Sequence, residues 1–172
     1  MSTQSSGIRA TAPRDAEMAE EQRLRADLAT LAASADGRRL LQLGLRGIAR
    51  GDRGVTAGCW IKRGDAGCLF QHAYWEGVRE GIFTDKGRPG DWIGSFVGPH
   101  DYGIVIRVIE SFDRLARSRY SDVEPRALLP DRVRLRQGEW NGVVERLLVE
   151  TLGETQPQPP VESTDPARVP SV

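Results

Sequence analysis

Apolar residues recur with a helical period near the start of the chain. Leu24, Leu28 and Leu31 stand at positions i, i+4 and i+7, which places them on one face of a helix. Asp15 can cap the start of this helix, and the Ser-Ala-Asp-Gly stretch at 34–37 interrupts the pattern. We therefore predict a first helix that begins near Asp15 and packs through its three leucines.

A second helical period covers residues 37–50. Its apolar positions are Leu40, Leu41, Leu45 and Ile48, and its outward positions are Arg38, Arg39, Arg46 and Arg50. Gly44 and Gly47 within this stretch lower the helix propensity. They also remove the side chains that would hold another backbone away. We therefore expect a close approach of another part of the chain there.

Three more helices are predicted over residues 66–81, 101–120 and 137–152. Their apolar faces hold Leu69, Phe70, Ala73, Tyr74, Gly77 and Val78; Tyr102, Val105, Ile106, Ile109, Phe112 or Asp113, and Ala116; and Trp140, Val143, Val144, Leu147, Leu148 and Thr151. Asp65 is the expected cap of the first of the three. Residues 103–109 also permit a strand, because five of the seven are Ile or Val. The helix is favoured, since the period continues through Leu115.

Four glycines and two prolines fall within residues 82–100. They predict a long loop, which Trp92, Ile93, Phe96 and Val97 would keep ordered and packed. The ends of the chain, 1–14 and 153–172, are rich in Ser, Thr, Gln and Pro, and we expect them to be disordered. The predicted fold is thus a mainly α, single-domain bundle of about five helices over residues 15–152.

The charges are balanced, with 24 basic and 24 acidic residues and a formal net charge of zero. The total charge therefore gives no reason to expect nucleic acid as a partner. The sequence has no signal-peptide pattern and no apolar run of about 18 residues, so we expect a cytoplasmic protein without a membrane span. The expected partner is another protein or a second copy of the chain.

Every cysteine and histidine lies between Cys59 and His100. Cys68 and His72 are four residues apart in a predicted helix, which places their Cβ atoms about 5–6 Å apart on one face. Two ligands of a tetrahedral zinc ion need about that spacing. Cys59 and His100 can complete a Cys2His2 set that holds zinc or iron and staples the weakly structured segments together. The simpler alternative treats both cysteines as small buried side chains.

The same residues also permit a thiol enzyme, with Cys68 activated near a helix N-terminus and His100 as its base. The order of Cys68, Pro-Gly-Asp at 89–91, His100 and the apolar run at 103–106 resembles the NlpC/P60-type, papain-like thiol hydrolases. That resemblance implies a catalytic Cys68 and His100, and a strand that begins after the histidine.

A basic stripe offers a third interpretation. It comprises Arg38, Arg39, Arg46, Arg50 and Arg53, and a helical nucleic-acid-associated regulator could use it, although a solvated helix face is the simpler explanation. We expect a non-enzymatic intracellular accessory or regulatory protein, in which residues 59–100 form a structural, ligand-binding or metal-binding centre. The thiol hydrolase and the nucleic-acid-associated regulator are the alternatives.

Overall fold

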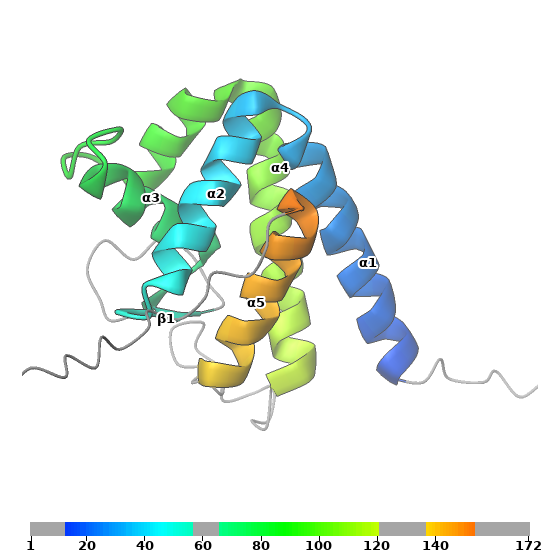
Figure 1. Ribbon diagram of the computed structural model, residues 1–172. Coiled ribbons are helices and arrows are strands. Elements are labelled where there is room, and N and C mark those ends of the chain that lie inside the picture. The colour runs from blue at the N-terminus through cyan, green and yellow to red at the C-terminus, as the bar shows by residue number, and fades with distance from the viewer. Residues whose placement is uncertain (1–12, 57–65, 121–136, 154–172) are drawn as a thin grey trace, which may run out of the picture.

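The computed structural model describes residues 13–56, 66–120 and 137–153, which form a bundle of helices (Figure 1). The helices are α1 (Pro13–Ala32), α2 (Ala35–Ala49), α3 (Leu69–Arg79), α4 (Pro89–Tyr120) and α5 (Gln137–Leu152). Two strands of two residues each, β1 (Gly54–Val55) and β2 (Ala66–Gly67), pair in parallel. The mainly α bundle predicted from the sequence is confirmed.

Several sequence predictions fall on residues outside these ranges. Cys59 is one of them, and both expected tails, 1–14 and 153–172, lie outside except for their innermost residues. Among the helices in the described part of the chain, none is both long and apolar enough to cross a membrane.

Helices α1 and α4 pack side by side along the bundle (Figure 1). Leu24, Leu28 and Leu31 of α1 are completely buried, as their spacing predicts. Ion pairs flank this apolar seam, from Arg107 to Asp27, Arg114 to Glu20 and Arg119 to Glu17. The partners run in opposite order along the two helices, which shows that the helices are antiparallel.

Gly44 and Gly47 of α2 face α3, and the predicted close approach is confirmed. A Cβ atom added to Gly47 would stand 2.7 Å from the backbone oxygen of His72. A Cβ atom added to Gly44 would stand 2.6 Å from the Cδ1 atom of Leu69. The absence of side chains at these positions therefore sets how near α3 can lie.

The expected loop over 82–100 is too long, because residues 89–97 are helical. Pro89 begins α4, at the position where a proline loses no helical hydrogen bond. Gly98 interrupts the helix with φ 77° and ψ 167°, a conformation open only to glycine, and Pro99 starts the next turn. The connection between α3 and α4 is confined to residues 80–88.

The rest of α4 settles the choice between helix and strand at 103–109, since this segment is helical. Ile104, Val105 and Val108 are buried, and Phe112 and Leu115 continue the buried stripe. Helix α4 contacts α1, α2 and α3, which explains why its apolar face is wide.

Helix α3 begins later than expected. Its N-cap is Cys68, not Asp65, because β2 occupies residues 66–67 immediately before it. Helix α5 holds the β1–β2 pair through β1, where the Val55 backbone N–H donates a hydrogen bond to Asn141 Oδ1 at 2.9 Å. This small sheet fixes the N-terminal end of α3 between α2, α4 and α5.

Candidate functional site

Most of the buried polar side chains among the described residues lie on helix α3. Three of the five buried polar or charged side chains are Gln71, His72 and Glu76, and the other two lie on α1 and α4. Buried polar groups are nearly always hydrogen-bonded, so each of the three should have partners that explain it.

Glu76 has all the partners that a buried carboxylate needs. Arg50 donates to both of its oxygens at 2.7 Å, and Arg79 donates to Oε2 at 2.8 Å. The hydrogen bonds from Arg50 hold the pKa of Glu76 below its ordinary value of 4.5. The carboxylate therefore stays charged and ties the end of α2 to α3, which is a structural role.

His72 is also satisfied. Its Nε2 lies 3.0 Å from the backbone oxygen of Gly54, and its ring meets the edge of Trp75 at a centroid distance of 5.3 Å. Burial lowers the pKa of His72 below 6.5, and the Gly54 and Gly47 carbonyls oppose only part of that effect. A neutral imidazole thus links α3 to β1.

The lowered pKa of His72 makes folding sensitive to mild acid. As the pH falls below about 6.5, the unfolded chain takes up a proton at this residue before the folded protein does, so stability decreases. His72→Gln should remove this dependence between about pH 7 and pH 5. Urea unfolding across that range measures it.

His100→Gln, the equivalent substitution at an exposed histidine, is the matched control for the change of side chain itself. Titration of Glu76 falls at lower pH, below its ordinary value of 4.5. Equal slopes for wild type and His72→Gln would show that His72 is not the titrating group.

Gln71 is the exception on α3. Its side chain is 0% exposed, yet neither Oε1 nor Nε2 has a hydrogen-bond partner among the residues that the structure describes. The side chain folds back over the residue before the helix N-cap, where a Cβ atom on Gly67 would meet Gln71 Cγ at 2.7 Å. An unsatisfied buried amide of this kind requires an explanation.

Gln71 folds over the N-terminal end of α3, whose own first turn supplies no negative group. The N-cap Cys68 makes no side-chain capping hydrogen bond, and the first turn has no acidic residue. The first backbone N–H groups of a helix have no partner within it and carry a partial positive charge. This end of α3 is therefore suited to a hydrogen-bond acceptor.

Arg53 lies beside the same end of α3. Its guanidinium carbon is 4.0 Å from the centre of the Trp75 ring, and the end of that ring, Cη2, closes over Gly67 together with Gln71. Within the described part of the chain, Arg53 makes no ion pair with a carboxylate. Stacking on Trp75 holds the planar, fork-shaped guanidinium group of Arg53 in place and leaves its N–H groups available as hydrogen-bond donors.

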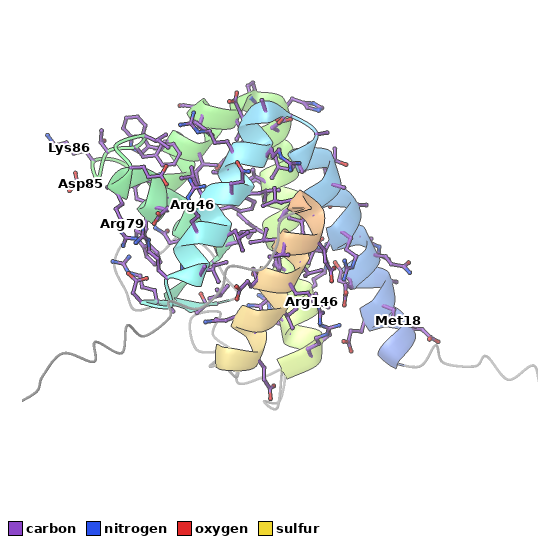
Figure 2. The ribbon with its side chains drawn as sticks, viewed as in Figure 1. Met18, Arg46, Arg79, Asp85, Lys86 and Arg146 are labelled. Carbon is purple, nitrogen blue, oxygen red and sulfur yellow. The ribbon has the colours of Figure 1, made fainter. Side chains whose placement is uncertain are left out.

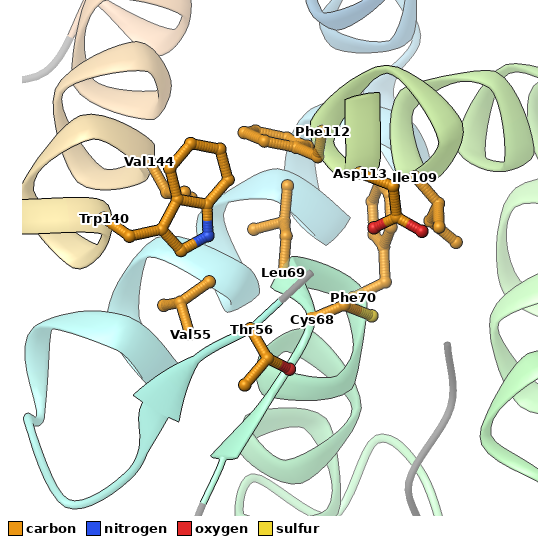
Figure 3. Close-up of a pocket in the computed structure, with 10 residues that line it drawn as sticks. All are labelled: Val55, Thr56, Cys68, Leu69, Phe70, Ile109, Phe112, Asp113, Trp140 and Val144. Carbon is orange, nitrogen blue, oxygen red and sulfur yellow. The ribbon is translucent and has the colours of Figure 1, made fainter. Parts of the chain in front are cut away.

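A small cavity borders residues 68–70 at this helix end (Figure 3). Thr56, Cys68, Asp113 and Trp140 are among its lining residues, and Leu69 stands between Trp140 and Asp113 in this view. Its volume is about 10 Å³, which is room for about one water molecule. The cavity is too small for an organic substrate.

The structure brings together only part of the predicted cysteine–histidine set. Cys68 and His72 share the first turn of α3, but His72 Nε2 already faces Gly54. His100 is exposed and lies 13 residues before Asp113, which lines the cavity with Cys68; that is roughly 20 Å along the α4 axis. Among the described residues, no three Cys, His, Asp or Glu side chains are grouped to hold a metal ion.

The same distance bears on the thiol-hydrolase resemblance. Cys68 and His100 are not within reach of each other, and the segment after His100 is helix where the resemblance implies a strand. A nucleophile and its base need direct hydrogen-bond contact or one bridging water.

The basic stripe is largely occupied by contacts within the protein. Arg46 pairs with Glu80, Arg50 with Glu76, and Arg53 stacks on Trp75. Arg38 donates to the backbone oxygen of Leu152, and Arg39 lies over the ring of Phe96. A nucleic-acid phosphate would have to compete with these contacts.

Sequence reasoning missed Gln71 and the role of Arg53. Gln71 occupies the third helical position after the Cys68 cap, where a Gln side chain commonly reaches back to the cap. That spacing was a signal for the residue, but not for its lack of partners. No family model matches this chain, and no curated protein or solved structure shows significant similarity to it.

Proposed function

We propose that this chain is a non-enzymatic cytoplasmic accessory or regulatory protein with a ligand-binding centre at the N-terminal end of α3. The centre lies around Gln71, within the region 59–100 that the sequence indicates. Binding there would be passed on to a protein partner or a second copy of the chain.

The unpaired amide of Gln71 carries the proposal. Leaving a buried donor or acceptor unsatisfied costs about 1–3 kcal/mol, whereas a whole domain is stable by only about 5–15 kcal/mol. A leucine would fill a similar space without that cost. The amide is therefore best explained as a group that pairs with a ligand.

Helix α3 offers no arrangement for catalysis beside this amide. His72 is held by Gly54, and Glu76 is neutralised by two arginines. Cys68 has no histidine in reach other than this one among the described residues. The polar groups of the centre are suited to binding rather than to proton transfer.

Gln71→Leu should stabilise the ligand-free protein by about 1 kcal/mol or more, because it removes two unsatisfied polar groups. Urea unfolding of protein that has been refolded and dialysed measures this change. The same variant, purified without denaturation, should lose a bound small molecule that native mass spectrometry detects on the wild type.

Ser111→Ala is the matched control, since Ser111 is also buried but accepts a hydrogen bond from Arg114 at 3.0 Å. It should lower stability by about 1 kcal/mol and retain the bound molecule. A Gln71→Leu variant that is less stable than wild type, together with a wild type that carries no small molecule, would contradict the proposal.

A further inference from the structure

We infer that the ligand at the N-terminal end of α3 is a small oxyanion, a phosphate or carboxylate group, which the Arg53 fork and the Gln71 amide bind together. This inference rests on the proposed function and deepens it by assigning the chemistry of the ligand. Four features of the described residues meet at this helix end.

The first two features belong to the helix itself. An α-helix of eleven residues presents partly positive N–H groups at its N-terminus, and anions bind at such ends. In α3 this end is not neutralised from within, because the Cys68 side chain does not cap it and its first turn has no acid. A negative group from outside would be stabilised there.

The third feature is the direction and burial of Gln71. The side chain is completely buried, and its Cβ and Cγ lie 2.8 and 2.7 Å from the place where a Gly67 Cβ atom would stand. Gly67 immediately precedes the Cys68 cap, so the stem of the unpaired Gln71 side chain leans back toward the N-terminal end of the helix. An anion bound at that end would lie near the amide.

The fourth feature is the positive charge of Arg53. Trp75 Cη2 lies 2.8 Å from the place where a Gly67 Cβ atom would stand, so Gln71 and Trp75 both pack against Gly67. Arg53 stacks on the Trp75 ring. Asp52, the nearest acid in sequence, is taken by Arg79 at 3.4 Å. Arg53 is thus a partly exposed, pre-positioned fork, which is the group that proteins use to bind phosphate and carboxylate.

The two atoms of the Gln71 amide refine the ligand class. Nε2 donates to the oxyanion, while Oε1 needs a donor on the same ligand. A hydrogen phosphate, or a carboxylate with a neighbouring hydroxyl group, supplies both. Asp113 lies on the cavity side of the helix end, so the anion is expected on the Arg53 side and not in the cavity.

Titration of the full-length, isotope-labelled protein with inorganic phosphate and with glycolate tests this inference. Chloride at matched ionic strength is the reference in both titrations. Saturable shifts are expected in the nitrogen–proton correlation signals of Leu69, Phe70 and Gln71, including the Gln71 side-chain NH2. A response to phosphate alone assigns a phosphate ligand, a response to glycolate alone assigns a hydroxy-carboxylate, and either result supports the inference.

Arg53→Gln should weaken the binding of the responding anion by roughly tenfold or more, since it removes a charge-assisted fork. Arg46→Gln is the matched control. Arg46 belongs to the same basic stripe and pairs with Glu80 on the exposed α2–α3 side of the molecule (Figure 2), so its loss should leave the affinity within about twofold.

Two results would overturn the inference: no saturable shift beyond that of chloride, or equal affinities in wild type and Arg53→Gln. Its failure is distinguishable from failure of the proposed function. If native mass spectrometry finds a neutral molecule that Gln71→Leu loses and Arg53→Gln keeps, the binding centre stands and the oxyanion assignment falls. If both probes bind wild type and Gln71→Leu equally, Gln71 is not part of the site.

Discussion

Trp140→Ala should lower the free energy of unfolding by about 3–5 kcal/mol, the range for truncating a large buried aromatic residue. The Trp140 side chain is completely buried and meets Phe112 edge to face at a centroid distance of 5.9 Å. It also forms one wall of the small cavity beside Leu69, so truncation would enlarge a space that the surrounding helices cannot easily close (Figure 3).

Urea unfolding measures this loss, with the slope of the transition compared between wild type and variant. Met18→Ala on α1 is the control, because Met18 is 57% exposed and its truncation should change stability by less than about 0.5 kcal/mol (Figure 2). A loss under about 1 kcal/mol for Trp140→Ala would mean that α5 does not pack through this face.

Gly47→Ala should destabilise the protein by about 1–3 kcal/mol relative to Gly44→Ala. Both changes add one methyl group to α2, and both raise helix propensity by about 1 kcal/mol. They differ in what the methyl group meets. At Gly47 it meets the His72 backbone, with oxygen at 2.7 Å and carbon at 3.1 Å. At Gly44 it meets the end of the Leu69 side chain at 2.6 Å, which can turn away.

The comparison therefore tests whether backbone contact holds α3 in place. Gly44→Ala should be close to neutral, whereas Gly47→Ala must push α3 away from α2 and strain the His72–Gly54 hydrogen bond. Thermal and urea unfolding of the two variants measure the difference. Equal stabilities would show that the α2–α3 contact can relax at both positions.

The helices and most of the core follow from local patterns in the sequence. Leu24, Leu28 and Leu31 predict the buried face of α1, and Trp140 with Val144 predicts that of α5. Such predictions succeed because a side chain four residues along a helix returns to the same face, whatever the helix packs against. The same argument chose helix for residues 103–109, and the structure agrees.

The first turns of α4 were missed because glycine and proline conceal them. Pro89 and Gly98 are signals of a loop in most contexts, yet here Pro89 opens a helix and Gly98 only interrupts it. Tertiary packing decides between these outcomes: Ile93 and Val97 are buried, and Phe96 lies against Phe83 at 5.4 Å. Burial of those side chains offsets the weak local preference for helix.

For the candidate site, the sequence by itself determined the region and the tertiary structure decided the residues. The clustering of Cys59, Cys68, His72 and His100 directs attention to residues 59–100, because composition is visible along the chain. Whether a side chain is buried without a partner depends on atoms from distant segments. Only the packing of Gly67, Trp75 and Arg53 around the end of α3 singles out Gln71. His100 is likewise separated from Cys68, because α4 is a helix that rises about 1.5 Å per residue. Sequence spacing alone does not reveal which turn of α4 lies against α3.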